Sequence, residues 1–121
     1  MAAGDFQLPV LSGSTNGDPI AIAATATPGT TIHTAQSGTS GVDVVELWAV
    51  NIDTAARTLT LEWGGTAAAQ RIGPITLGAS RGPILIAGPW PLNNGNVIAG
   101  FADVANMVNV VGRVGRYTDS A

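Results

Sequence analysis

Apolar and polar residues alternate along much of the chain, in short runs that are separated by turns. Residues 57–63 show this most clearly, because every second position is apolar: Leu59, Leu61 and Trp63 alternate with Thr58, Thr60 and Glu62. In a strand, successive side chains point to opposite faces of the sheet. The pattern therefore predicts a strand that places the leucines and the tryptophan in a core and Glu62 on the solvent side.

Eight such runs follow residue 18 at intervals of roughly 8–12 residues, with Gly, Pro and Asn-Gly turns between them. They span residues 20–26, 30–35, 42–51, 57–63, 69–77, 83–87, 96–102 and 107–117. No segment repeats its apolar residues at the helical period of 3.6. The spacing predicts an all-β, antiparallel β-sandwich, and eight strands fit a jelly roll, in which two Greek keys form two facing sheets. Another Greek-key or immunoglobulin-like sandwich is the alternative, because periodicity does not separate the two.

The run at residues 42–51 is the longest and has apolar residues at both odd and even positions. Such a run is typical of a central strand that is covered on both faces. We expect it to form a hairpin with residues 57–63. The predicted core combines residues of these runs with residues of the last two: Val44, Trp48, Leu59, Leu61, Trp63, Val97, Phe101, Val108 and Val110.

The start of the chain differs from the rest, and we expect an extended N-terminal arm (residues 1–17) before one sandwich domain (residues 18–121). Residues 12–17 are rich in Ser, Gly and Asn, which is typical of a flexible hinge. The apolar residues of the arm must then pack on another surface. Trp90, which lies between two prolines, is a further candidate for a contact. The predicted interface residues are Phe6, Leu8, Val10, Leu11 and Trp90.

Charged residues make up only 11% of the chain and lysine is absent, whereas an average globular protein has about 25% charged residues. So few charges would solvate the surface of a monomer poorly, and we expect partners to cover part of that surface. The formal net charge is −3 and the five arginines are scattered. Phosphate binding needs clustered basic residues, so we expect no nucleic-acid partner.

No run approaches the roughly 20 consecutive apolar residues that a membrane-spanning helix needs. The first residues also lack the basic stretch and apolar run of a secretory signal. We therefore expect no association with a membrane, and we expect the chain to be made in the cytoplasm. Because cysteine is absent, disulfide bonds and thiolate chemistry are excluded.

The sequence offers few residues for catalysis. His33 is the only histidine, and its surroundings, Thr-Ile-His-Thr, favour a structural histidine in a strand over the base of a Ser-His-Asp triad. Glu46 and Glu62 are the candidates for a glycosidase pair, but we expect both to be solvated or salt-bridged. No P-loop or dinucleotide-binding motif is present.

For calcium, the candidate aspartates are far apart and none opens a D-x-D-x-D-G loop: Asp18, Asp43, Asp53 and Asp103. The sequence thus predicts no catalytic, cofactor-binding or metal-binding site.

Several stretches carry a resemblance to a known group of proteins. They are Thr31–Ala35 (TIHTA), Glu46–Asn51 (ELWAVN), Leu61–Gly65 (LEWGG) and Gly88–Ala99 (GPWPLNNGNVIA). Over roughly residues 29–114, this order of turns, strands and hairpins resembles small virion structural proteins of tailed bacteriophages, of the capsid (head) decoration type.

The resemblance implies a protein on the exterior of the capsid that clamps neighbouring capsomers against internal pressure. Its partners would be the major capsid protein and further copies of itself, as a homotrimer. We therefore expect a non-enzymatic head decoration protein that stabilises the capsid shell of the virion as an oligomer.

Three alternatives stay open. Similar sandwiches occur in phage necks, tails and fibres, so the chain could be such a component. A carbohydrate-binding module would need two or more exposed, coplanar rings, and only Trp90 looks available. A small hydrolase would need His33 beside a nucleophile in a cleft.

Overall fold

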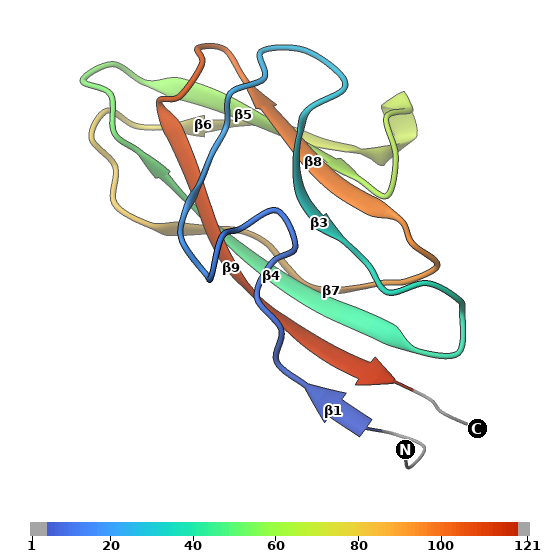
Figure 1. The fold of residues 1–121 in the computed structure, drawn as a ribbon. Coiled ribbons are helices and arrows are strands. Elements are labelled where there is room, and N and C mark those ends of the chain that lie inside the picture. The colour runs from blue at the N-terminus through green and yellow to red at the C-terminus, as the bar shows by residue number, and fades with distance from the viewer. Residues whose placement is uncertain (1–4, 119–121) are drawn as a thin grey trace.

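The computed structural model describes residues 5–118, which form two antiparallel sheets packed face to face (Figure 1). The predicted all-β architecture is confirmed. In chain order the elements are β1 (Asp5–Gln7), β2 (Ile20–Ala21), β3 (Thr30–Thr34), β4 (Val42–Asn51), β5 (Arg57–Trp63), the 3-10 turn η1 (Ala68–Gln70), β6 (Arg71–Leu77), β7 (Ile84–Leu92), β8 (Val97–Ala102) and β9 (Val108–Thr118). No helix in this part of the chain is long and apolar enough to cross a membrane.

One sheet, which we call sheet A, has the strand order β1-β9-β4-β7, and β2 also pairs with β9. The other, sheet B, has the order β3-β8-β5-β6. Each of the eight predicted runs overlaps one of the strands β2–β9. The predicted count of eight is too low for the described residues, because β1 adds a ninth strand within the predicted arm.

The core lies between the sheets and is built from aliphatic side chains of both. The largest fully buried ones are Ile22, Ile32, Val45, Leu47, Leu59, Leu61, Leu77, Ile98, Val108 and Val110. Of the predicted core, Leu59, Leu61, Val108 and Val110 are confirmed. Trp63 packs against the core but is partly exposed, and Val97 and Phe101 are also only partly buried.

The prediction for β4 chose the wrong face. Its buried positions alternate with partly exposed ones, and the buried set is Asp43, Val45, Leu47, Ala49 and Asn51. Val44 and Trp48 therefore lie on the outer face of sheet A. The predicted hairpin with residues 57–63 is also wrong, because β4 pairs with β7 and β9 while β5 pairs with β6 and β8.

The N-terminal segment lies along its own sandwich from residue 5 onward. β1 pairs with the end of β9, with Phe6 opposite Tyr117. Leu11 is only 3% exposed and belongs to the core, and the backbone N–H of Gly13 donates to the carbonyl of Ile32 at 2.9 Å. Leu11 was predicted as an interface residue, and this is wrong because its side chain is enclosed by the sandwich. Residues 1–4 of the predicted arm lie outside the described residues.

Prolines occupy two strands at the edges of the sheets. β6, at the edge of sheet B, contains Pro74, and β7, at the edge of sheet A, contains Pro89 and Pro91. Proline has no N–H to donate, so it discourages the addition of another strand. A sheet face or a loop is therefore better suited to receive a partner than these edges.

Candidate functional site

A buried polar cluster joins the two sheets. At its centre is Asp43 of β4, whose carboxylate accepts two hydrogen bonds from Arg116 of β9: Nε donates to Oδ1 and Nη2 donates to Oδ2, each at 2.8 Å. Nε2 of His33, on β3 in the other sheet, lies 2.8 Å from Oδ2. The side-chain amide of Gln36 donates to Oδ1 at 3.2 Å. We call these four residues the Asp43 cluster.

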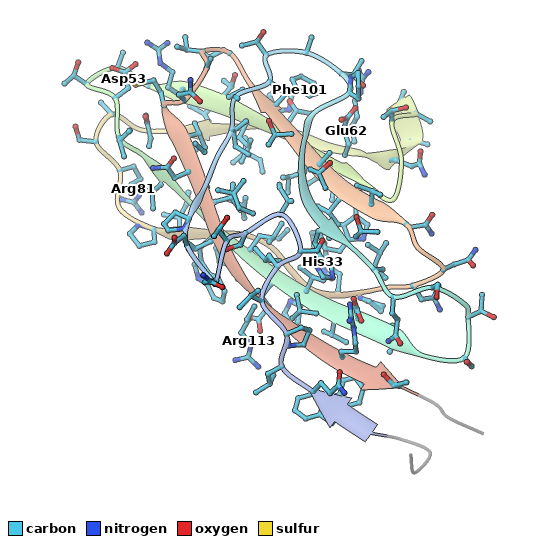
Figure 2. The ribbon with its side chains drawn as sticks, in the orientation of Figure 1. His33, Asp53, Glu62, Arg81, Phe101 and Arg113 are labelled. Atoms are coloured by element: carbon cyan, nitrogen blue, oxygen red, sulfur yellow. The ribbon has the colours of Figure 1, made fainter. Side chains whose placement is uncertain are left out.

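The hydrogen bonds of His33 do not have the pattern of a catalytic triad. Its Nδ1 accepts the backbone N–H of Ser12 at 3.0 Å, so this nitrogen carries no proton and Nε2 donates to Asp43. The hydroxyl of Ser12 instead accepts the N–H of Thr34. A serine nucleophile needs its hydroxyl on the imidazole, so Ser12, His33 and Asp43 do not form a catalytic triad. Figure 2 shows His33 between the sheets, where its ring is buried.

The cluster shifts the acidity of its members. Burial alone would raise the pKa of Asp43, but the hydrogen bonds from Arg116 and His33, together with the charge of Arg116, outweigh burial and hold the pKa below its ordinary value. The hydrogen bond to Asp43 raises the pKa of Arg116. The ionised pair is therefore the stable form in the folded protein.

We expect the cluster to make the free energy of unfolding depend on pH in the acidic range. Since Asp43 binds its proton at a lower pH in the folded than in the unfolded chain, its contribution is complete above about pH 5 and is lost as the pH falls through about 4 and below. Urea denaturation at a series of pH values should show this fall, and Asp43→Asn should make it smaller. The residual fall in the variant would come from carboxyls such as Asp53, whose pKa is lowered by its hydrogen bond from Arg57. An equal fall in both proteins would contradict the role of Asp43.

Glu62 is buried, so the prediction that it faces solvent is wrong. Its Oε1 accepts the backbone N–H of Gly29 at 2.7 Å, and its Oε2 accepts the hydroxyl of Thr27. The alternation placed Glu62 correctly on the side away from the core, but the loop between β2 and β3 covers that side (Figure 2). Glu46 lies on the other sheet, so the two glutamates do not form a carboxylate pair.

Removing the Glu62 carboxylate should loosen this loop. Glu62→Ala leaves the N–H of Gly29 without its acceptor, and we expect the free energy of unfolding to fall by about 1–3 kcal/mol. Amide hydrogen exchange should become faster in residues 22–29. Asp18→Ala is the control and should change stability little, since this carboxylate is exposed. Equal effects of the two substitutions would show that Glu62 does not hold the loop.

Asp53 and Asp103 both bind Arg57. Nη2 of Arg57 lies 2.7 Å from Asp53, and Nη1 lies 3.4 Å from Asp103. Within residues 5–118, no group of three or more His, Asp or Glu side chains is placed to hold a metal ion. The two aspartates thus link Arg57, at the start of β5, to the loops that precede β5 and follow β8.

The outer face of sheet A is largely apolar. Directly paired residues of an antiparallel sheet share a face, so the registers define its members. They are Val42, Val44, Glu46, Trp48 and Val50 of β4, Asn109, Val111, Arg113, Gly115 and Tyr117 of β9, Leu85 and Pro91 of β7, Phe6 of β1 and Ala21 of β2. We call this surface the sheet A face. Its large apolar members include three that are about half exposed: Phe6, Leu85 and Tyr117.

One ion pair lies in the middle of the sheet A face. Glu46 and Arg113 are direct partners in the register of β4 and β9, with Nε of Arg113 3.4 Å from Oε1 of Glu46. Arg113 is 67% exposed and Glu46 23%. In Figure 2, Arg113 points away from the sandwich interior. These two are the only charged residues among the members of this face.

The predicted interface residue Trp90 is 41% exposed and lies on β7. Its ring packs edge-on against Trp63 of sheet B, with centroids 5.3 Å apart and an angle of 80° between the planes. A sugar ring stacks best on coplanar aromatic rings, so this perpendicular pair is a poor carbohydrate platform. Trp90 both closes one side of the sandwich and keeps part of its ring exposed.

The other predicted interface residues lie in the N-terminal segment. Leu8 is 67% exposed and Val10 is 50% exposed. Phe6 is also exposed, but its ring contacts Tyr117 with centroids 4.8 Å apart, which makes it part of the sheet A face. The structure therefore separates Leu11, in the core, from Leu8 and Val10, which face outward.

Sequence reasoning missed the Asp43 cluster and the sheet A face. Asp43, Val45 and Leu47 are alternate residues of β4 and so point to the same face, which was the one available signal that Asp43 points inward. Nothing in the sequence indicated Arg116 as its partner, since 73 residues separate the two. Comparisons of the chain with protein-family models, with curated proteins and with solved structures found no match.

Proposed function

We propose that this chain is a non-enzymatic structural subunit of a tailed-bacteriophage virion, and specifically a head decoration protein that binds the major capsid protein on the exterior of the capsid. The observation that carries the proposal is the contrast between its interior and its surface. The buried polar side-chain atoms of the described residues all have hydrogen-bond partners, whereas large apolar side chains are exposed, Leu8, Val10 and Trp90 among them. Exposed apolar surface of this kind is typical of a protein that binds other proteins.

The strand order supports a jelly roll as the finer description of the sandwich. Consecutive strands from β2 to β9 alternate between the sheets, except that β5 and β6 are neighbours in sheet B. The resulting orders, β2-β9-β4-β7 and β3-β8-β5-β6, are those of two Greek keys wrapped into facing sheets. Jelly rolls are common in viral capsid proteins and in lectins. The perpendicular tryptophan rings favour the viral role over the carbohydrate-binding one.

In this proposal the protein stabilises the capsid by adding interface area. A stable interface buries roughly 1,600 Å², and many weaker contacts repeated over a shell act together. Leu8 and Val10 are the contact residues we assign to the capsid protein, because they follow β1 and point away from the sandwich while Leu11 anchors the segment. The alternative within the same class is a neck, tail or fibre component.

The proposal is tested by sedimenting purified protein with phage heads that lack it. Each apolar side chain that is buried in the contact is worth at most about 1.5–3 kcal/mol, so Leu8→Asp combined with Val10→Asp should weaken binding by more than about tenfold. The control is Ile52→Asp, which changes a similarly exposed residue at the opposite end of sheet A. Wild-type protein that binds tails and not heads would favour the alternative, and unchanged binding of the double variant would remove the N-terminal segment from the contact.

A further inference from the structure

We propose that the sheet A face binds a second copy of this chain, face to face, around a two-fold axis that runs between β4 and β9. This face is a different surface from Leu8 and Val10, and its pairing does not depend on attachment to a capsid. The dimer would form from the isolated chain and can be tested on it alone.

The distribution of charge on the sheet A face favours this dimer. Glu46 and Arg113 lie side by side on neighbouring strands in the middle of the face, and its other members are uncharged. A two-fold axis along the strands exchanges the positions of β4 and β9 in the opposing copy. Glu46 of each copy then faces Arg113 of the other, and the four charges form an alternating square. A buried ion pair needs such additional partners, because desolvation otherwise cancels its gain.

The apolar side chains of the face also fit this arrangement. Within one copy, each β4 residue has a register partner on β9. Across the two-fold axis, the same β4 residue faces the equivalent β9 residue of the other copy. The large Trp48 then lies opposite Val111, and Val42 lies opposite Tyr117. Large residues thus oppose smaller ones, which lets the two faces interdigitate at the usual separation of about 10 Å between packed sheets.

The area of the face is sufficient for a specific contact. The strands of sheet A, which are β1, β2, β4, β7 and β9, lie at about 4.8 Å spacing with a rise of about 3.3 Å per residue, so their residues cover about 550 Å² per copy. Two copies would bury about 1,100 Å², which is above the roughly 1,000 Å² that a biological interface should bury. The prolines of β6 and β7 discourage association through these two edge strands. The sheet A face is therefore the better surface for association.

The test is the mass of the purified full chain in solution, measured by sedimentation equilibrium over a range of concentrations. Wild-type protein should form a dimer. Arg113→Glu places four negative charges in the contact and Glu46→Arg places four positive ones, so each variant alone should weaken dimerisation by at least about tenfold. Arg71→Glu, at an exposed arginine of β6 in the other sheet, is the matched control and should dimerise like the wild type.

Mixing the two charge variants separates the interface from any effect on folding. The Arg113→Glu variant carries two carboxylates at the centre of its face and the Glu46→Arg variant carries two guanidinium groups there, so opposite charges meet only in the mixed dimer. The mixture should therefore regain dimers that contain one copy of each variant. A wild-type monomer at all concentrations, a trimer as the phage resemblance implies, or an Arg113→Glu variant that dimerises normally would each overturn the proposal. A monomer whose binding to heads is lost on Arg113→Glu would assign the face to the capsid protein instead.

Discussion

Asp43→Ala is expected to lower the free energy of unfolding by about 3–5 kcal/mol, the usual result when one partner of a buried ion pair is removed. The substitution leaves the guanidinium of Arg116 without its bidentate partner and Nε2 of His33 without an acceptor in a buried site. The two sheets lose the polar link between β3 and β4. The loss should therefore exceed that from any exposed ion pair of the chain.

Urea denaturation of the wild type and the variant measures this difference. Asp103→Ala is the control, since it also removes a carboxylate from an arginine, but from a side chain that is 41% exposed. We expect a much smaller loss there. A loss below about 1 kcal/mol for Asp43→Ala would mean that the cluster does not hold the sheets together.

Leu11→Ala is expected to lower the free energy of unfolding by about 2–5 kcal/mol, the range for emptying a leucine site in a core. The physical reason is that Leu11 is buried with the aliphatic residues of both sheets. The N-terminal segment is held there by Ser12 and Gly13, whose N–H groups bond to His33 and Ile32. The segment is thus a part of the fold as well as a carrier of exposed residues.

Leu8→Ala is the matched control, because it removes the same atoms three residues away from an exposed position. We expect Leu8→Ala to leave the midpoint of urea denaturation nearly unchanged. A Leu11→Ala variant as stable as the Leu8→Ala variant would show that the segment does not contribute to the core. Deleting residues 1–11 does not separate the two roles, since the deletion would also remove Leu11.

The alternation of residues predicts strands well where only one face of the strand is apolar. At β5 it identified Leu59 and Leu61 as core residues, and the structure confirms both. At β4 both faces are apolar, so the alternation does not indicate which face is buried. The buried face also carries the polar residues Asp43 and Asn51, which are unusual in a core. Which face turns inward is decided by the Asp43 cluster and by the packing of the second sheet.

Pairing between strands could not be predicted from local signals. β4 and β5 follow each other closely in sequence, which favoured a hairpin, but they belong to different sheets. Burial by loops is equally hidden: Glu62 stands on the outer side of sheet B, and only the fold shows that residues between β2 and β3 cover it. The short β1 and the burial of Leu11 likewise depend on contacts with distant residues of β9 and β3.

Under the proposed function the chain is encoded by a tailed phage, and a cryo-EM map of the virion of that phage tests the structural role most directly. We expect density for the two-sheet sandwich on the exterior of the head, with Leu8 and Val10 against the major capsid protein. Density for the sandwich in the neck, tail or fibres would move the protein to the alternative placement. Absence of the protein from the purified particle would contradict the proposed structural role.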